Sequence, residues 1–286
     1  MPDFGQRLDA AFDAFGHVCL GIDAHSYLLG EWGLPDSAEG VRAFGVRAVE
    51  AAAGVVGIVK PQIAFFERHG SAGYAALEEV LRVARSAGLV VIADVKRGDI
   101  GSTIDAYGEA WLTPGSPLEV DAMTLVAYQG VGSLGGPLGL ARAHGKGAFV
   151  LAATSNVEAY PLQSAQLQTG ANHRMTVAAG IVSEVDVLNN GDGPGSGGLG
   201  SVGVVIGATV DFGDYGIDAG LLASTPILAP GFGEQGAVLS RLPELYGAAS
   251  ANVIANLGRS VLKQGPDGLR PALQRQADEL RLALDA

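Results

Sequence analysis

The chain has 286 residues, of which 48% are hydrophobic and 17% are charged, a composition that supports a large core and excludes intrinsic disorder. Its 18 basic and 30 acidic residues give a formal net charge of −12 at pH 7, so we expect no binding to nucleic acid or to an anionic membrane surface. The 43 glycines follow no three-residue period, which excludes a collagen helix and indicates many tight turns.

The start of the chain and the single cysteine point to a cellular location. Residues 1–5 lack the basic and then apolar order of a signal peptide. The longest uncharged stretches, such as 122–140, are broken by glycine and proline and make poor membrane spans. Cys19 lies in an apolar run and has no second cysteine to pair with. We therefore predict a cytoplasmic protein in which Cys19 is a buried small hydrophobe.

Eight short apolar runs, many of them rich in β-branched residues, recur along the chain. We predict a strand for each run, and a parallel sheet, because strands buried on both faces read as continuous apolar segments. In chain order the predicted strands are Val18–Asp23, Val55–Lys60, Leu89–Lys96, Ala122–Ala127, Ala148–Thr154, Val202–Thr209, Pro226–Pro230 and Asn252–Leu257.

Amphipathic segments lie between most of these runs and predict helices, although the connection after Thr209 is less clear. Helices at the two ends of the chain are predicted to close the ends of a barrel. The internal helices are Gly40–Ala53, Gly70–Ala87, Gly101–Leu112, Leu134–His144, Ala171–Leu188 and Gly236–Ala249, and the terminal ones are Arg7–Phe15 and Leu269–Leu284.

Eight β–α units in one chain favour the α/β class and a (β/α)8 TIM barrel, with residues 1–286 forming a single catalytic domain. A doubly wound dinucleotide-binding sheet is disfavoured, because Gly21–His25 after the first strand lacks the G-x-G-x-x-G pattern. No linker rich in proline or serine divides the chain. The glycine-rich tract Asn189–Ser201 is interpreted as a surface loop rather than a phosphate-binding one.

Charged residues gather at the predicted strand ends, where barrels of this kind carry out their chemistry. Asp23 ends the first strand, Lys60 the second, and Asp94-x-Lys96 the third, with Asp99 following in the loop. Residues two apart on a strand point to the same side, so Asp94 and Lys96 should both face the barrel mouth.

A lysine held among these carboxylates stays protonated and can deliver a proton to a carbanion. A purely structural ion-pair network at the rim is the alternative. A Schiff base at Lys60 is a further alternative, but it needs a neutral lysine, and Asp23 and Asp94 would keep Lys60 charged.

The last two strand ends are suited to phosphate. The loops after strands 7 and 8 are the usual phosphate site of TIM barrels. Here they run from Pro230 to Gly236, with Gln235, and from Gly258 to Ser260, with Arg259 at a predicted helix start. Glycines allow close approach of backbone N–H groups, and a guanidinium binds phosphate in a planar fork. Simple turns with a solvated Arg259 are the alternative.

No metal site is expected. His25, His69, His144 and His173 show no metal-ligand spacing, and the sequence has no cysteine cluster. Only His25, two residues after Asp23, is a candidate for a role at the site.

With these residues in place, the chain resembles orotidine 5'-phosphate decarboxylase, in particular its longer bacterial subgroup. The resemblance runs from about residue 17 to 262. It is carried by the ordered segments Gly21–Asp23, Val59–Gln62, Phe65–Glu67, Val91–Thr103, Ala153–Asn156, Val205–Thr209, Pro230–Gly233 with Gln235, and Asn256–Arg259.

The resemblance implies a cofactor-free decarboxylation of orotidine 5'-monophosphate to uridine 5'-monophosphate and CO2, with a role for each matched residue. Lys96 would protonate C6 of the pyrimidine, Asp94 would lie beside the substrate carboxylate, and Lys60 would support Asp94 and a ribose hydroxyl. The other implied substrate contacts are Asp23 to a ribose hydroxyl, Ser155 to the pyrimidine edge, Gln235, Gly258 and Arg259 to the 5'-phosphate, and Pro230 lining the pocket.

The resemblance also implies a homodimer, in which Asp99, Ile100 and Thr103 of one subunit reach the site of the other. Two alternatives stay open at this point. One is a magnesium-dependent sugar-phosphate decarboxylase or synthase of the same superfamily, and the other is a non-catalytic barrel that binds a nucleotide.

Overall fold

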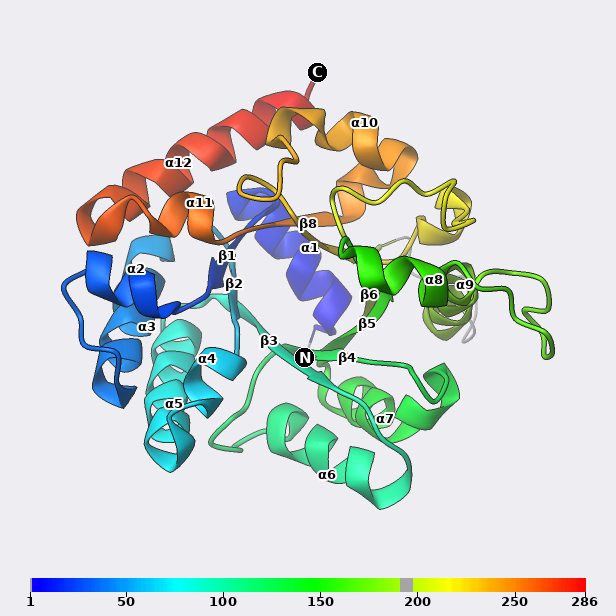
Figure 1. Cartoon of the computed structure of the whole chain (residues 1–286), viewed down its shortest axis with the longest axis horizontal. Helices are drawn as coiled ribbons and strands as arrows, with labels where there is room; N and C mark the ends of the chain where they lie inside the picture. Colours follow the sequence, from blue (N-terminus) through cyan, green and yellow to red (C-terminus); the bar gives the residue numbers. More distant parts are fainter. Residues whose placement is uncertain (1, 191–197) are drawn as a thin grey trace.

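The computed structural model describes residues 2–190 and 198–286, so the middle of the glycine-rich tract predicted as a surface loop lies outside the described residues. Eight parallel strands form a closed barrel in the sequential order β1 to β8, surrounded by helices (Figure 1). The predicted α/β barrel is confirmed. No helix in the described part of the chain is both long and apolar enough to cross a membrane.

All eight predicted strands are present, each overlapping its predicted range. The strands are β1 Val18–Ile22, β2 Ile58–Pro61, β3 Val90–Arg97, β4 Ala122–Leu125, β5 Gly147–Ala153, β6 Val202–Ile206, β7 Ile227–Pro230 and β8 Val253–Leu257. β8 pairs with β1 and closes the barrel.

Twelve α-helices and five short 3₁₀-helices are found among the described residues. The α-helices are α1 Phe4–Phe15, α2 Ser26–Glu31, α3 Ala38–Ala52, α4 Ala64–Glu67, α5 Gly70–Ser86, α6 Gly101–Leu112, α7 Gly135–His144, α8 Tyr160–Gln163, α9 Val177–Asn190, α10 Leu242–Tyr246, α11 Arg259–Leu262 and α12 Gly265–Leu284. The 3₁₀-helices are η1 Val131–Leu134, η2 Val157–Ala159, η3 Ala219–Leu222, η4 Leu239–Arg241 and η5 Gly247–Asn252.

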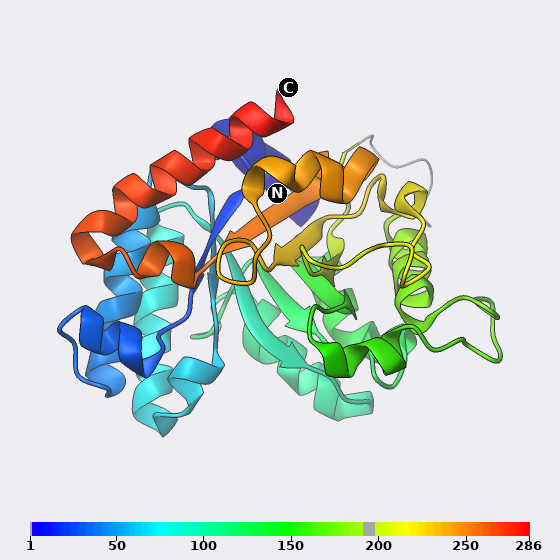
Figure 2. The same ribbon diagram turned by 45° about the horizontal axis from the view of Figure 1, so that its top comes forward.

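The helix predicted over Ala171–Leu188 is present as α9, but it starts later than predicted. Thr176 pairs with Gln166 in an isolated antiparallel bridge, and its hydroxyl oxygen accepts a hydrogen bond from Ala179 N at 3.0 Å. This bond is an N-terminal cap, so helix α9 begins directly after Thr176. The residues between the two partners of the bridge, 166–176, form a segment that extends away from the barrel (Figure 2).

The helix predicted over Gly236–Ala249 is divided into η4, α10 and η5. Pro243 lies in the first turn of α10, the part of a helix that tolerates a missing N–H. Gly247 follows α10 with a φ of 53°, a left-handed conformation that ends a helix. The prolyl start and the glycine stop leave room for only a short α-helix.

The inside and the outside of the barrel form two separate cores, because successive strand residues point to opposite faces. The inner cluster joins alternate strand residues to one side of α1, whereas the larger cluster lies between the sheet and the surrounding helices. The inner strand residues are Cys19, Ile58, Val90, Ile92, Ala122, Phe149, Val205, Leu228 and Ile254. The predicted burial of Cys19 is confirmed.

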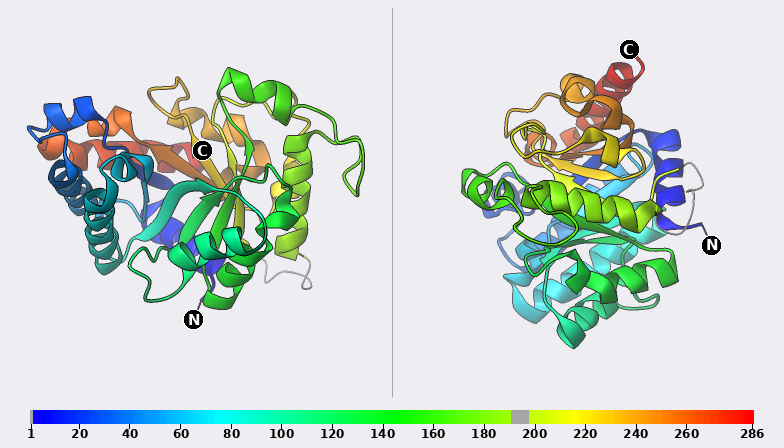
Figure 3. Two further views of the ribbon diagram at one scale, coloured as in Figure 1. Left: turned by 60° about the horizontal axis from the view of Figure 1, so that its bottom comes forward. Right: turned by 90° about the vertical axis from the view of Figure 1, so that its right-hand side faces the viewer.

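Helix α1 closes the amino-terminal end of the barrel, as predicted (Figure 3). Phe4 is fully buried and meets the ring of Phe149 edge to face, with 5.8 Å between ring centroids. A Cβ on Gly147 would lie 2.4 Å from the Phe4 ring, so only glycine leaves room for it. Helix α12 instead packs in the outer ring beside α3 and α10, so the prediction that it closes a barrel end is wrong.

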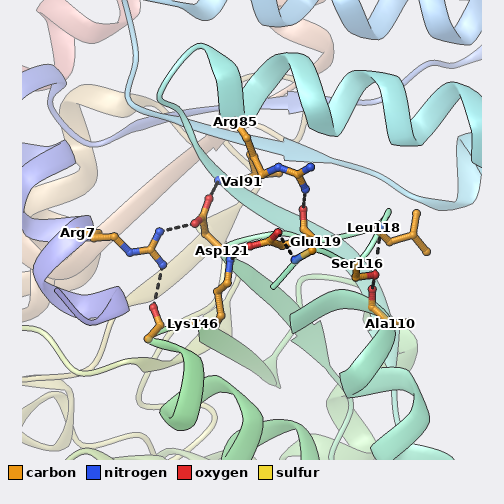
Figure 4. Close-up of polar contacts among 11 residues, drawn as sticks. Arg7, Arg85, Val91, Ala110, Ser116, Leu118, Glu119, Asp121 and Lys146 are labelled. Carbon is orange, nitrogen blue, oxygen red and sulfur yellow. Dashed lines mark hydrogen bonds and ion pairs between the residues drawn. The ribbon is translucent and has the colours of Figure 1, made fainter. Parts of the chain in front are cut away.

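A polar network links α1 to the amino-terminal end of the barrel (Figure 4). Asp121, just before β4, accepts a hydrogen bond from Val91 N at 2.8 Å and forms an ion pair with Arg7 of α1. Beside it, Lys146 Nζ donates to Glu119 Oε1 at 2.8 Å. These charges lie at the amino-terminal ends of the strands, where TIM barrels carry stability rather than chemistry.

Candidate active site

A layer of polar side chains lies inside the barrel just above its apolar core. Each follows an inward-facing apolar residue by two positions, so strand alternation points it into the barrel mouth. The pairs are Ile58 and Lys60, Ile92 and Asp94, Ala122 and Thr124, and Ile254 and Asn256.

The carboxylate of Asp94 is the centre of this layer. Its Oδ2 accepts hydrogen bonds from Lys60 Nζ at 2.8 Å and from Gln62 Nε2 at 3.0 Å. Its Oδ1 accepts one from Thr124 Oγ1 at 3.0 Å and forms an ion pair with Lys96 Nζ. The prediction that Asp94 and Lys96 face the mouth together is confirmed.

The charges in this layer are strongly coupled. Burial by itself raises the pKa of the Asp94 carboxyl, but the ammonium groups of Lys60 and Lys96 lower it well below its ordinary value. Burial lowers the pKa of Lys60, yet Asp94 and Asp23 more than reverse this and raise it above its ordinary value. Lys60 therefore stays protonated at neutral pH, which removes the neutral amine that a Schiff base needs.

Lys96 is held at the mouth in an unusual backbone conformation. Its φ is 47°, which costs roughly 1–2 kcal/mol for a residue with a Cβ. The ladder between β3 and β4 shifts register just before Arg97, and Lys96 N donates to Thr124 Oγ1 at 2.9 Å. The Lys96 side chain is 46% exposed. A strained residue with a reachable ammonium group is typical of a functional position.

Asp23 presents a carboxylate oxygen that lacks a donor. Its Oδ1 is buried and has no hydrogen-bond partner within residues 2–190 and 198–286. On its other side, a Cβ on Gly258 would lie 2.9 Å from Asp23 Oδ2, so glycine allows the carboxylate to occupy this place. Buried acceptors are nearly always satisfied, so the free Oδ1 leaves a place for a donor from water or from a ligand.

The loops after β7 and β8 lie side by side, because the strands that precede them are paired. Gly233 has a φ of 82°, and a Cβ there would lie 2.6 Å from Ser260 Oγ. Gln235 of the same loop meets the loop after β5, with Ser155 Oγ and Gln235 Oε1 3.4 Å apart. The structure therefore brings together loops that are far apart in the sequence.

A cavity of about 620 Å³ opens at this end of the barrel. The predicted site residues Asp23, Asp94, Lys96 and Arg259 line it. The other lining residues are His25, Gln62, Ala64, Phe65, Glu67, Val95 and Arg97. The predicted site residues Ser155, Pro230, Gln235 and Gly258, and the buried Lys60 beneath it, do not line this cavity.

A larger cavity of about 810 Å³ lies between α7 and α9, near the amino-terminal ends of the strands. It is bordered by Asn190 and Gly198, which flank the residues outside the described part of the chain. None of the predicted site residues lines it, so the smaller cavity is the candidate active site.

His25 lines the candidate cavity, with its ring 4.4 Å from that of Phe65 between centroids. Burial lowers the pKa of His25 and outweighs the opposing effect of Asp23. At neutral pH the imidazole is therefore uncharged.

Asp99, Ile100 and Thr103 lie outside the cavity of their own chain. Asp99 Oδ1 accepts a hydrogen bond from Ile100 N at 2.8 Å, and in the described structure the ion pair of Lys96 is with Asp94 and not with Asp99. Ile100 is 60% exposed. Within a single chain, Asp99 is not brought to the acid that it was predicted to flank.

Three polar residues of the mouth were assigned no role from the sequence: Gln62, Thr124 and Asn256. Gln62 and Thr124 donate directly to Asp94. Asn256 is 8% exposed, and its Oδ1 has no hydrogen-bond partner in the described residues. Inward alternation along β4 and β8 could have found Thr124 and Asn256, because each follows an inward apolar residue by two.

Within residues 2–190 and 198–286, no three histidine, cysteine, aspartate or glutamate side chains form a cluster able to hold a metal ion. At the mouth, Asp94 pairs with Lys60 and Lys96 instead.

The sequence profile of the orotidine 5'-phosphate decarboxylase / HUMPS family matches residues 16–270. Among curated relatives named orotidine 5'-phosphate decarboxylase, that of Streptomyces coelicolor is 47% identical over 289 aligned positions, covering 100% of both chains. That of Salinispora arenicola is 46% identical, covering 99% of each.

Solved structures agree with these matches. A crystal structure from Streptomyces avermitilis, assigned to orotidine 5'-phosphate decarboxylase, gives a TM-score of 0.91 at 45% identity and covers 100% of this chain and 97% of that one. The OMP decarboxylase of Leishmania donovani gives 0.75 at 26% identity, covering 99% and 100%.

Proposed function

Since this chain belongs to the orotidine 5'-phosphate decarboxylase / HUMPS family, we propose that Lys96 is the acid in a decarboxylation of orotidine 5'-monophosphate. The enzyme is a carboxy-lyase that forms uridine 5'-monophosphate and CO2, a step of pyrimidine nucleotide biosynthesis. The observation that carries the assignment of Lys96 is its ion pair with buried Asp94 at the mouth of the barrel.

The reaction follows from these charges. The bond between C6 and the carboxylate breaks, CO2 leaves, and the electron pair stays on C6. The Lys96 ammonium gives a proton to C6 and afterwards regains one from solvent. Asp94 beside the substrate carboxylate adds repulsion that is relieved as CO2 leaves, while Lys60 keeps Asp94 ionised. No cofactor or metal enters this scheme.

The remaining contacts hold the nucleotide. The unpaired Oδ1 of Asp23 accepts from a ribose hydroxyl, and Lys60 supports a ribose hydroxyl as well as Asp94. Ser155 reads the pyrimidine edge. The 5'-phosphate lies at the loops after β7 and β8, held by Gln235, Gly258 and Arg259 with Pro230 lining the pocket, and its binding energy helps to desolvate the reacting centre.

A homodimer completes the site. Asp99, Ile100 and Thr103 extend from the rim at the start of α6 rather than into their own cavity, and Ile100 exposes a large apolar side chain. These features support a contact in which the three residues serve the neighbouring subunit. We also propose a cytoplasmic location, because the single cysteine is buried and free, as is usual in reducing compartments.

The activity is tested with purified protein treated with EDTA. We expect the absorbance of orotidine 5'-monophosphate to fall while uridine 5'-monophosphate forms. A folded, dimeric sample that shows no turnover until magnesium is restored would favour the metal-dependent sugar-phosphate relatives. Binding of the nucleotide without any turnover would favour a non-catalytic barrel.

The sharing of Asp99 is tested by mixing two inactive variants, Lys96→Ala and Asp99→Ala. In a mixed dimer, the subunit with Asp99→Ala keeps its own Lys96 and receives Asp99 from its partner, so one of the two sites is intact. Random exchange in an equal mixture should restore about a quarter of the wild-type activity. A mixture as inactive as its components would refute the shared site.

A further inference from the structure

We infer that Thr124 is a positioning residue for the decarboxylation, because its hydroxyl joins the backbone of Lys96 to the carboxylate of Asp94. The inference rests on the proposed role of Lys96 and adds the element that aims its ammonium group. Thr124 is on β4, whereas Lys96 and Asp94 are on β3.

The hydroxyl has one possible arrangement. Thr124 Oγ1 lies 2.9 Å from Lys96 N and 3.0 Å from Asp94 Oδ1. A backbone N–H can only donate and an ionised carboxylate can only accept. The hydroxyl therefore accepts from Lys96 and donates to Asp94, and the direction of its hydrogen is fixed.

This link acts on a strained residue. Lys96 has a φ of 47°, and the shift in register before Arg97 interrupts the regular ladder between β3 and β4 at this point. Strained conformations persist only where surrounding contacts over-determine them. The bond from Lys96 N to Thr124 is such a contact, because it holds the left-handed backbone from the neighbouring strand.

The same hydroxyl fixes the position of the carboxylate. Asp94 Oδ2 is held by Lys60 and Gln62, whereas on the Oδ1 side the partners are Thr124 and the ammonium group of Lys96 itself. A carboxylate anchored from both oxygens cannot rotate about its terminal bond. With Thr124 in place, Lys96 meets Asp94 in one geometry.

Thr124 is well suited to this task. It is 1% exposed, so water does not compete for its hydroxyl. Its β-branched side chain also restricts χ1, which limits the directions that the hydroxyl can take. A buried threonine without such a role could be replaced by valine at the cost of stability alone.

The test compares Thr124→Val and Thr124→Ser with a matched control, Thr225→Val. Valine keeps the shape but removes both hydrogen bonds, whereas serine keeps them. Thr225 is also fully buried, and its hydroxyl accepts from Asn189 Nδ2 at 3.2 Å, away from the cavity. The control thus measures the general effect of deleting a buried threonine hydroxyl.

We expect Thr124→Val to lower kcat roughly 10- to 100-fold, the effect of losing one or two buried hydrogen bonds in the transition state. KM and the affinity for uridine 5'-monophosphate should change less than about threefold, because the printed partners of Thr124 are Asp94 and Lys96, not the residues proposed to hold the ribose, the pyrimidine edge and the 5'-phosphate. Thr124→Ser should restore most of kcat, and Thr225→Val should lower the melting temperature without lowering kcat.

Three results would overturn the inference: a wild-type kcat in Thr124→Val, a serine variant as slow as the valine variant, or a loss confined to KM. Each of these leaves decarboxylation by the wild-type protein intact. Failure of the proposed function would appear differently, as a wild-type enzyme without activity toward orotidine 5'-monophosphate.

Discussion

Replacement of Lys60 by methionine tests whether the buried charges at the mouth are balanced as the structure indicates. The Lys60 side chain is 5% exposed, and its Nζ lies 2.8 Å from Asp94 Oδ2. Methionine fills similar space but leaves Asp94 with one cation instead of two. Removing one partner of a buried ion pair typically costs about 3–5 kcal/mol.

We expect the lower end of that range, about 3 kcal/mol, because Lys96, Gln62 and Thr124 still contact Asp94. For a chain of this size the melting temperature should fall by roughly 6–12 °C. The pKa of Asp94 should rise, since Lys60 is the largest of the effects that lower it.

The assay is thermal and urea unfolding of Lys60→Met beside a matched control, Lys263→Met. Lys263 also pairs with a carboxylate, Glu234 Oε1 at 2.6 Å, but its side chain is 52% exposed. An exposed pair of this kind is worth at most about 1 kcal/mol. Equal shifts for the two variants would refute the argument that burial makes the pair at Lys60 critical.

Three further predictions concern stability. Phe4→Ala should lower the free energy of unfolding by about 3–5 kcal/mol, because it removes a fully buried ring that packs against Phe149. Urea unfolding measures this loss, and a loss below about 1 kcal/mol would contradict the packing role of Phe4. Gly147→Ala should destabilise by roughly 1–3 kcal/mol through overpacking, since its Cβ would lie 2.4 Å from the Phe4 ring, and the double variant with Phe4→Ala should recover part of that loss. Because Asp94 has a lowered folded-state pKa, its ionised form stabilises the fold above the unfolded value of about 3.9, and this contribution is lost as the pH falls toward the folded value. The stability of wild type relative to Asp94→Asn should therefore be constant from about pH 5 to 8 and shrink below about pH 4; a difference that shrinks near pH 7 would contradict the lowered pKa.

The fold could be predicted well because each strand carries its own signal. The runs around Val91 and Ile254 are apolar on both faces, and this pattern requires a covered parallel sheet. Helix bounds differed from the predicted ones where local capping and turn residues decided them. The hydroxyl of Thr176 and the left-handed Gly247 set the limits of α9 and α10, and neither effect changes the hydrophobic pattern.

The site could be predicted in part. Asp94 and Lys96 share a strand, so local alternation sufficed to place them together. Gln62 and Thr124 contact Asp94 from the segments on either side of β3. The sequence does not show how neighbouring strands are aligned, so these contacts could not be predicted from it. Alternation along β4 could have marked Thr124 as inward-facing, but its contact with Asp94 depends on how β4 pairs with β3.

The sequence by itself determined the barrel class, the family resemblance and the residues that carry charge at the strand ends. These properties depend on short-range patterns, in which period two and residue type are visible within a few positions. Only the tertiary structure decided which donors meet Asp94, that Oδ1 of Asp23 lacks one among the described residues, and that Asp99 lies outside its own cavity. The reason is physical, because hydrogen bonds and desolvation act over a few ångströms between residues that the chain places far apart.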